Sequence, residues 1–317
     1  KDTMMKKVKS LLLLLFLLLV SHRGHAQQEA TFAQFMFAHQ LLNPAYVGAK
    51  SYTNLTALHR DQWVGFEGAP VTQALAVNGR IKGRKLGWGL SVLNDNIGPV
   101  VNTSVSLDAA YHLQINEAGH QLAVGVKIGA QNYNIDTSMI QTITPGDAAF
   151  VMGDSGELIP NVGFGVYYHH TRFYVGFSIP RLLNSDLYEV SRHAYMIGGA
   201  IFNLTTDWSI KPSILLKQSE GSPLGYDFST LLVYSKRFWL GPRLRSALEA
   251  PLPDSEFGGS YGLLGGVHLS PNWSVGYAYN TGLGDLSPSF NSGSHEIMIR
   301  FDFNVRDLST LRSPRIF

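Results

Sequence analysis

The chain has 317 residues, of which 45% are hydrophobic and 15% charged, and it contains 32 glycines and no cysteine. The charged fraction is far below the roughly 25% of soluble domains, which disfavours an ordinary cytoplasmic enzyme. The apolar content excludes a disordered chain, and the mean hydropathy of +0.02 excludes a polytopic helical membrane protein. The lack of cysteine excludes disulfides, thiolate zinc sites and iron–sulfur clusters. A β-barrel is the class that these values favour.

Residues 1–26 are predicted to be a secretory signal peptide with an upstream remnant, residues 1–3. Lysines precede an unbroken apolar run at residues 11–20, and small residues stand before a cleavage site at Gln27. The run is about half as long as a bilayer-spanning helix, so a short membrane anchor is the less favoured alternative.

Removal of the signal peptide changes the charge balance. Five of the 25 lysines and arginines and one of the 23 acidic residues lie in residues 1–26, which leaves 20 basic against 22 acidic residues. No basic run remains that could follow a nucleic-acid backbone, and we expect no nucleic acid among the partners.

Beyond residue 50 the dominant hydrophobic period is two, which predicts strands. In residues 122–129, for example, Leu122, Val124, Val126 and Ile128 alternate with Ala, Gly and Lys127. We predict fourteen strands, at 51–60, 71–80, 86–94, 104–113, 121–132, 160–168, 171–179, 194–203, 207–217, 226–234, 237–247, 260–269, 273–280 and 294–304.

One face of these strands is aliphatic or aromatic and the other is small or charged. A soluble sandwich would carry lysine, glutamate and threonine on its outer face, whereas small and charged residues suit a crowded barrel lumen with the apolar face toward lipid. We therefore assign Val124 and Val126 to lipid and Lys127 to the lumen, and expect Lys127→Ala to be mild. Aromatic residues near strand ends fit interfacial girdles: Trp63, Trp88, Tyr111, Trp208, Trp239 and Trp273.

The connections alternate between long and short, as in outer-membrane barrels with external loops and periplasmic turns. The predicted long ones are 61–70, 95–103, 133–159, 180–193, 218–225, 248–259 and 281–293. Both ends of the mature chain then face the periplasm. The expected organisation is an N-terminal periplasmic segment at 27–50, an all-β transmembrane antiparallel barrel at 51–304 and a C-terminal periplasmic tail at 305–317, in the outer membrane of a Gram-negative bacterium.

Three sequence features resemble catalytic or metal motifs. Residues 258–262 match G-x-S-x-G but open a glycine-rich strand instead of a strand–turn–helix elbow. His295-Glu296 lacks the second histidine of a zincin motif, and His169-His170 occupies a short turn. We predict no enzyme activity and no cofactor, metal or catalytic residue.

The most distinctive sequence blocks follow the signal peptide. Residues 32–37 (FAQFMF) lead into 42–48 (LNPAYVG), and 60–73 (RDQWVGFEGAPVTQ), 90–99 (LSVLNDNIGP), 294–297 (SHEI) and 313–315 (SPR) come later. Together they closely resemble the PorP/SprF family of outer-membrane proteins, which is linked to type IX secretion and gliding motility. The resemblance runs from about residue 28 to the C-terminus.

The resemblance implies an accessory that helps secrete or anchor a specific adhesin-like cargo at the cell surface and contacts a periplasmic, peptidoglycan-binding or lipoprotein partner. We expect the partner contact in residues 28–46 and 306–317, and the cargo contact in the loop from Trp63 to Pro70. A passive diffusion porin is the main alternative, and an outer-membrane enzyme comes third. The candidate family-signature and partner-contact residues are Asn43, Pro44, Tyr46, Gly48, Arg60, Gln62, Trp63, Gly65, Phe66, Gly68, Pro70, Asp95, Gly98, Pro99, His295, Glu296, Pro314 and Arg315.

Overall fold

The computed structural model describes residues 31–136, 157–183, 192–219, 222–247, 259–282 and 292–303. The predicted signal peptide and the C-terminal tail, with Pro314 and Arg315, lie outside these residues. Within the described ranges, no helix has the length and apolar character needed to cross a membrane.

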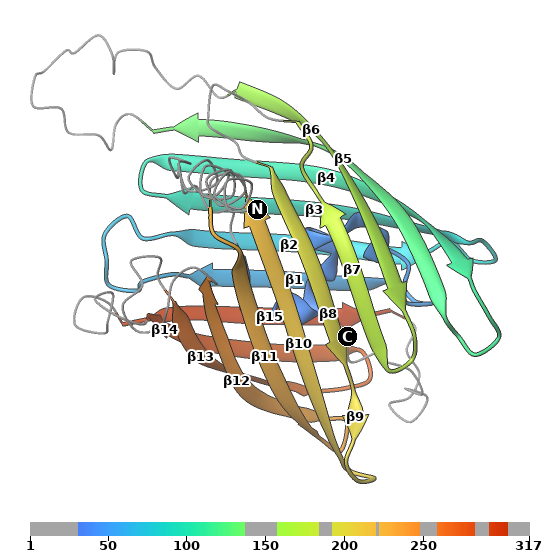
Figure 1. Ribbon diagram of the computed structural model, residues 1–317. Coiled ribbons are helices and arrows are strands. Elements are labelled where there is room, and N and C mark those ends of the chain that lie inside the picture. The colour runs from blue at the N-terminus through green and yellow to red at the C-terminus, as the bar shows by residue number, and fades with distance from the viewer. Residues whose placement is uncertain are drawn as a thin grey trace, which may run out of the picture.

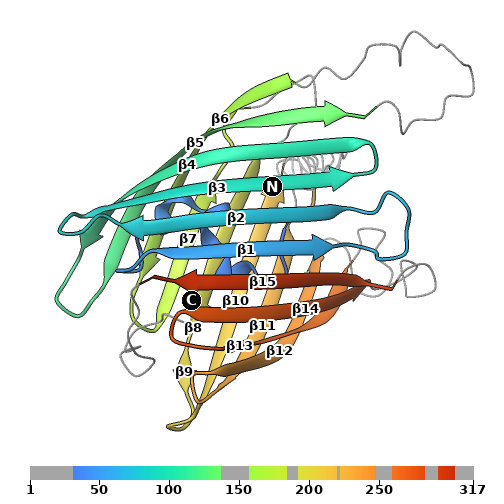
Figure 2. The same ribbon diagram turned by 180° about the vertical axis from the view of Figure 1, so that it is seen from behind.

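The described strands form one closed antiparallel sheet (Figures 1 and 2). Strands that follow one another in the sequence pair with each other, except that β8 and β9 both pair with β10, and β15 pairs with β1 to close the ring. The strands are β1 (Asn54–Asp61), β2 (Val71–Arg80), β3 (Leu86–Ile97), β4 (Val100–Gln114), β5 (Gln121–Ile135), β6 (Glu157–His169), β7 (Phe173–Ile179), β8 (His193–Ala200), β9 (Phe202–Asn203), β10 (Trp208–Ser219), β11 (Gly225–Tyr234), β12 (Phe238–Ala247), β13 (Ser260–His268), β14 (Trp273–Gly282) and β15 (Ser294–Asp302).

Two of these strands, β8 and β9, are pieces of one barrel strand. Both pair with β10 in the same register, Gly199 with Ser213 and Phe202 with Ile210. Between them Pro212 of β10 has no backbone N–H to donate, which interrupts the ladder. The barrel therefore has fourteen strands, as the sequence predicts.

The predicted inside–outside register is confirmed. Val124 and Val126 are 40% and 51% exposed on the outer wall, whereas Lys127 is 4% exposed in the lumen. Trp88 is exposed on the outer wall, as a girdle residue must be, whereas the prediction for Trp239 is wrong: it is buried in the lumen, with its ring centroid 5.4 Å from that of Phe37.

One predicted long connection is also wrong. Residues 95–103 are not a loop, because β3 continues to Ile97 and β4 begins at Val100, with only Gly98 and Pro99 between them. Gly98 has a φ of 54°, and its missing Cβ permits this left-handed turn. The wall therefore extends further at this hairpin than the sequence pattern indicated.

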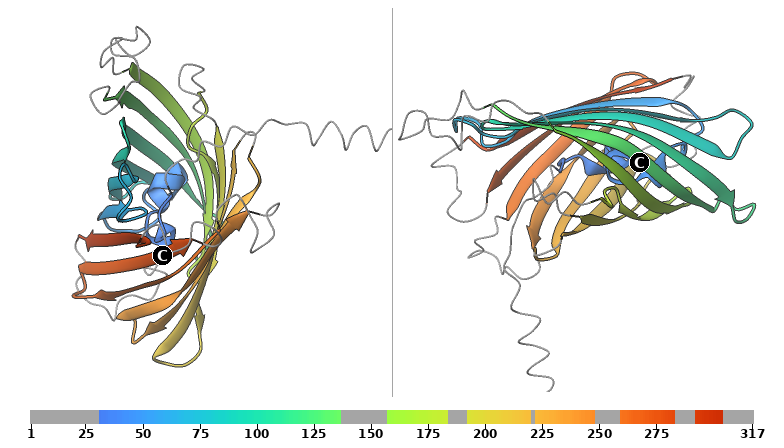
Figure 3. Two further views of the ribbon diagram at one scale, coloured as in Figure 1. Left: turned by 90° about the vertical axis from the view of Figure 1, so that its left-hand side faces the viewer. Right: turned by 90° about the horizontal axis from the view of Figure 1, so that it is seen from above.

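Residues 31–50 lie inside the barrel, and not in a separate segment outside it as we expected. They form three short helices, η1 (Phe35–Phe37), α2 (His39–Leu42) and η2 (Pro44–Tyr46), which Figure 3 shows in blue within the wall. Phe35, Met36 and Tyr46 are almost completely buried. Burial of such large apolar side chains stabilises this placement by roughly 1.5–3 kcal/mol each relative to an exposed segment.

Candidate functional site

The luminal segment, defined here as residues 31–49, carries no lysine, arginine or carboxylate. Its one histidine, His39, is almost completely buried. The segment is therefore neutral inside a wall that carries charges on its inner face. Backbone groups and amide side chains must supply the hydrogen bonds to that wall.

The first anchor of the luminal segment is a carboxylate on β15. Glu296 is completely buried and accepts hydrogen bonds from the backbone N–H groups of Ala33 (2.6 Å) and Gln34 (2.9 Å). On the neighbouring strand β1, Arg60 is the register partner of Glu296 and donates to the carbonyl oxygen of Thr31. An acid and a base side by side on the wall thus bind opposite backbone groups of the same segment.

A second anchor lies at Gln40, in the middle of the segment. Its amide nitrogen lies 3.2 and 3.1 Å from the carbonyl oxygens of Val77 and Leu90. Its amide oxygen accepts a hydrogen bond of 2.9 Å from Asn78. One side chain therefore joins the segment to β2 and β3.

Asn43 has a double role as helix cap and wall contact. Its side-chain oxygen Oδ1 accepts from the N–H of Ala45 (2.9 Å) and thereby caps η2, with Pro44 in the first helical position. Its amide nitrogen donates to the carbonyl oxygens of Val166 on β6 (3.0 Å) and Phe177 on β7 (3.3 Å).

Glycines on the inner face make room for this segment. A Cβ at Gly125 would lie 2.4 Å from the backbone nitrogen of Ala45, and one at Gly87 would lie 1.9 Å from the carbonyl oxygen of Val47. A Cβ at Gly165 would lie 2.1 Å from the Asn43 amide oxygen. The small inner-face residues therefore fit a peptide segment and do not leave a wide aqueous lumen.

The luminal segment runs from the loop end of the barrel to the turn end. Thr31 contacts Arg60, close to the β1–β2 loop, whereas the carbonyl oxygen of Val47 accepts from His112 Nε2 (2.9 Å) near the short β4–β5 turn. Gly48, with a φ of 77°, then directs the chain toward β1. The first described residue thus lies at the loop end, whereas the two ends of the mature chain, which we expect at the turn end, lie outside the described residues.

The β1–β2 loop, residues 62–70, is fixed on both sides. Its ends meet through a hydrogen bond of 2.9 Å from the Gln62 N–H to the Pro70 carbonyl. Val64 exchanges two backbone hydrogen bonds, both 2.8 Å, with Ser292 and Gly293 before β15. On the other side the Gly98 N–H donates to the Gly68 carbonyl (2.9 Å).

The candidate residues predicted from the sequence thus separate into two groups. Asn43, Pro44, Tyr46, Gly48, Arg60 and Glu296 meet in the lumen, and Gln62, Trp63, Gly65, Phe66, Gly68, Pro70, Gly98 and Pro99 gather at the loop end. Asp95 accepts a hydrogen bond of 2.6 Å from the Thr72 hydroxyl, within the wall. His295 lies on the outer side of β15 at the loop end, opposite Asp61 of β1 and 2.5 Å from the Tyr277 hydroxyl.

Sequence reasoning missed Gln34 and Gln40 as luminal residues. The sequence did carry an indication, because an uncharged apolar stretch between the signal peptide and the first strand has to be buried against another part of the protein. Glu296 was singled out in the sequence as part of an incomplete metal motif and as a partner-contact candidate, and not as a residue that binds the luminal segment. Among the described residues, no three histidine or acidic side chains are placed to hold a metal ion.

A closed antiparallel barrel with an apolar outer wall and a charged lumen is an outer-membrane barrel. The chain belongs to the family of the type IX secretion system membrane protein PorP/SprF, whose model matches residues 24–301. Family and fold together place it in the Gram-negative outer membrane, in a class of secretion-system barrels and not in an enzyme class. No curated protein matches the chain.

Similar solved structures are outer-membrane barrels of low identity. The toluene transporter TbuX of Ralstonia pickettii is 12% identical, with a TM-score of 0.48, over 84% of this chain and 92% of that one. Omp33 of Acinetobacter baumannii is 11% identical, with a TM-score of 0.43, over 81% and 100%. The KdgM porin is 11% identical, with a TM-score of 0.37, over 79% and 99%.

Proposed function

We propose that this barrel is a non-enzymatic accessory of type IX secretion that helps secrete or anchor a specific surface cargo at its loop end and contacts a periplasmic, peptidoglycan-associated partner at its turn end. The observation that carries the proposal is the occupied lumen. Glu296, Arg60 and Asn43 hold the luminal segment at both ends of its course. A barrel built in this way is suited to bind at its two rims more than to conduct solutes through its centre.

The occupied lumen argues against the porin alternative. A diffusion porin needs an aqueous channel along the barrel axis, and its width depends on what fills the interior. Here the filling segment is bonded to the wall by charge-assisted and amide hydrogen bonds, and its large side chains are buried. For conduction the segment would have to leave, and its apolar residues would then face water.

The β1–β2 loop supplies the cargo contact in this proposal. Trp63, Val64 and Phe66 are exposed there, although the loop backbone is held by hydrogen bonds on both sides. Exposed aromatic residues on a preorganised loop lose little entropy on binding and provide a large share of interface energy.

The periplasmic contact must differ in part from our sequence-based expectation. Residues 31–46 are buried in the lumen and offer little surface to a partner. At the turn end, the N–H of Phe303 donates to the carbonyl oxygen of Thr53 (2.8 Å), which fixes the point where the chain leaves β15. We therefore assign the partner contact to the short turns and the residues that follow position 303.

The experiment compares two exposed apolar side chains at opposite ends of the barrel. Phe66 in the β1–β2 loop and Leu204 in the turn before β10 are both 60% exposed. Cells carrying Phe66→Ala should lose cargo from their surface at unchanged barrel abundance, whereas Leu204→Ala cells should keep it. Full cargo retention by a Phe66→Ala strain, and by one that also carries Val64→Ala, would contradict the assignment of the cargo contact.

A further inference from the structure

The short turns at one end of the barrel carry an excess of positive charge. Six exposed cations lie on them: Lys82, Arg84 and Lys85 between β2 and β3, Arg172 between β6 and β7, and Lys236 and Arg237 between β11 and β12. The described turns at this end carry only two exposed carboxylates, Glu117 and Asp207. Within the described part of the chain, none of the six cations forms an ion pair. Their charge is therefore available to a partner outside the barrel.

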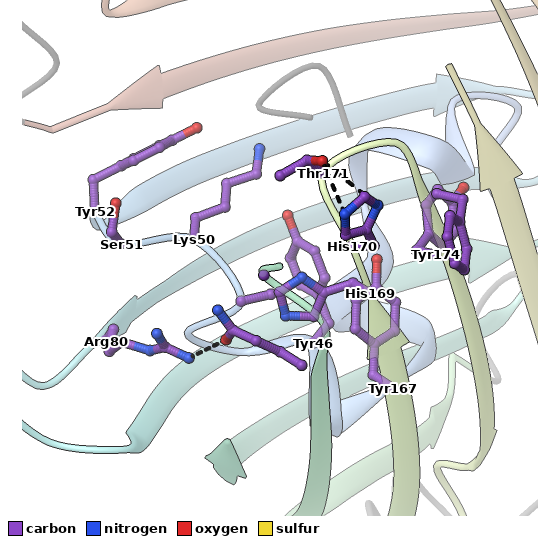
Figure 4. Close-up of a pocket in the computed structure, with 14 residues that line it drawn as sticks. Tyr46, Lys50, Ser51, Tyr52, Arg80, Tyr167, His169, His170, Thr171 and Tyr174 are labelled. Carbon is purple, nitrogen blue, oxygen red and sulfur yellow. Dashed lines mark hydrogen bonds between the residues drawn. The ribbon is translucent and has the colours of Figure 1, made fainter. Parts of the chain in front are cut away.

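Two other cations at this end belong to the interior. Lys50 and Arg80 line a cavity of about 250 Å³ that Tyr167 and Tyr174 also line (Figure 4). Arg80 donates from Nη2 to the side-chain oxygen of Gln121 (2.9 Å), as the dashed line in Figure 4 shows. These two side chains serve the lumen, and they add nothing to the exposed charge.

The basic turns are distributed around the barrel and do not form one patch. In the order of the sheet, four barrel strands separate the β2–β3 turn from the β6–β7 turn, and four more separate the latter from the β11–β12 turn. A protein contacts one side of such a rim, whereas a lipid leaflet surrounds it. The β13–β14 turn, residues 269–272, has no charged residue, and this part of the rim beside β15 is left for the periplasmic protein contact proposed above.

Aromatic side chains lie on the outer wall next to the β2–β3 turn. Trp88 and Tyr111 are exposed there, and Tyr111 is the register partner of Leu86, which directly follows Lys85. Tryptophan and tyrosine are enriched where a membrane protein meets the lipid headgroups. Lysine and arginine beside them extend their charged ends to the same level.

The β11–β12 turn repeats this combination. Tyr234 and Phe238 flank the turn on the outer wall, and the ring centroid of Trp208 lies 4.6 Å from that of Tyr234. The guanidinium carbon of Arg237 lies 5.8 Å from the ring centroid of Phe238. Two separate turns thus place cations directly beside exposed aromatic rings.

The β11–β12 turn is also preorganised. Ser235 and Lys236 have φ values of 48° and 53°, at positions where asparagine, aspartate and glycine are usual. The Arg237 N–H donates to the Tyr234 carbonyl (2.9 Å), and the Ser235 N–H to the Asp207 carbonyl (2.7 Å). A lysine held at the tip of such a tight turn loses little backbone freedom on binding.

We propose that the turn end binds phospholipids with an anionic headgroup at two sites. The sites are the β2–β3 turn with Trp88 and Tyr111, and the β11–β12 turn with Trp208, Tyr234 and Phe238. The cations bind phosphate oxygens, and the rings pack against the glycerol and upper acyl region. Each lysine or arginine near an anionic membrane surface strengthens the attraction about fivefold. This inference does not depend on the proposed function, because it involves no component of secretion.

Native mass spectrometry of the purified full chain in detergent tests this proposal. The probe is an equimolar mixture of dioleoylphosphatidylglycerol and dioleoylphosphatidylcholine, which share acyl chains and phosphate but differ in net charge. The wild-type chain should retain two molecules of phosphatidylglycerol and bind them tighter than phosphatidylcholine by about fivefold or more. Equal binding of the two lipids would overturn the proposal.

Lys236→Gln together with Arg237→Gln should remove one of the two bound phosphatidylglycerol molecules, because the loss of two cations weakens that site about 25-fold. Arg181→Gln together with Arg192→Gln is the matched control. It makes the same change of net charge at the loop end, between β7 and β8, and should leave both molecules bound. Heat-modifiable migration in electrophoresis shows whether each variant is folded.

The β2–β3 turn supplies a second, independent variant. Lys82→Gln, Arg84→Gln and Lys85→Gln together should remove the other bound phosphatidylglycerol molecule. Unchanged lipid binding in both turn variants would overturn the proposal. If these variants keep their lipid but lose a periplasmic protein that copurifies with the wild type, the cations belong to a protein contact and the lipid proposal is wrong.

Discussion

Replacement of Glu296 by glutamine tests the attachment of the luminal segment in a side chain of almost the same size. The glutamate accepts two backbone hydrogen bonds, of 2.6 and 2.9 Å, at a site with 0% exposure. Glutamine offers one acceptor and turns an NH2 group toward the second N–H. Loss of one charge-assisted bond, together with a buried unsatisfied donor, costs about 3 kcal/mol. The fraction of molecules with a detached segment should then rise about 150-fold, at 1.4 kcal/mol per factor of ten.

Cysteine labelling measures this change directly, because the chain has no cysteine of its own. Met36 is fully buried in the luminal segment, so a maleimide should reach a Met36→Cys variant only after the segment has detached. Adding Glu296→Gln should raise the labelling rate about 150-fold. Asp61→Asn, on the outer face of β1, is the control and should leave the rate unchanged. A labelling rate within threefold of the parent in the Glu296→Gln background would refute our account of this anchor.

Three further predictions concern the wall and its orientation. Gly125→Val should displace the luminal segment, because its Cβ would lie 2.4 Å from the Ala45 backbone nitrogen, and should accelerate the same labelling reaction. Val126→Arg should destabilise the barrel in lipid by about 2–4 kcal/mol, because it places a charge on the lipid-facing side. Lys127→Ala should cost about 3–5 kcal/mol, contrary to our sequence-based expectation of a mild effect, because Asp108 loses its ion-pair partner at 2.9 Å. Denaturant unfolding in vesicles measures both free energies. A membrane-impermeant maleimide should label Phe66→Cys but not Lys82→Cys on intact cells. The reverse pattern would mean that the barrel has the opposite orientation in the membrane.

Period-two alternation was sufficient to predict the barrel and its register, because each wall residue faces either lipid or lumen. Val126 and Lys127 therefore followed from the sequence alone. Trp239 did not, since an aromatic residue near a strand end suits an interface and a lumen equally well. Its placement depends on Phe37, which is far away in the sequence.

The luminal segment could be predicted least. Composition shows that Phe35 and Met36 need burial, but it does not show which surface buries them. That surface is created by glycines such as Gly125 and Gly165 on strands that are distant in sequence, and the fit appears only when the barrel is closed. The family-signature residues Asn43 and Glu296 were selected for partner contacts, and the structure uses both to hold this segment.

The central claim is that the lumen is occupied, and conductance across a planar lipid bilayer tests it most directly. The purified wild-type chain should insert without a steady open-channel current, because residues 31–49 fill the barrel. A variant that lacks residues 32–46 but still shows heat-modifiable migration should conduct. A stable wild-type channel with the same conductance as that deletion variant would contradict the account.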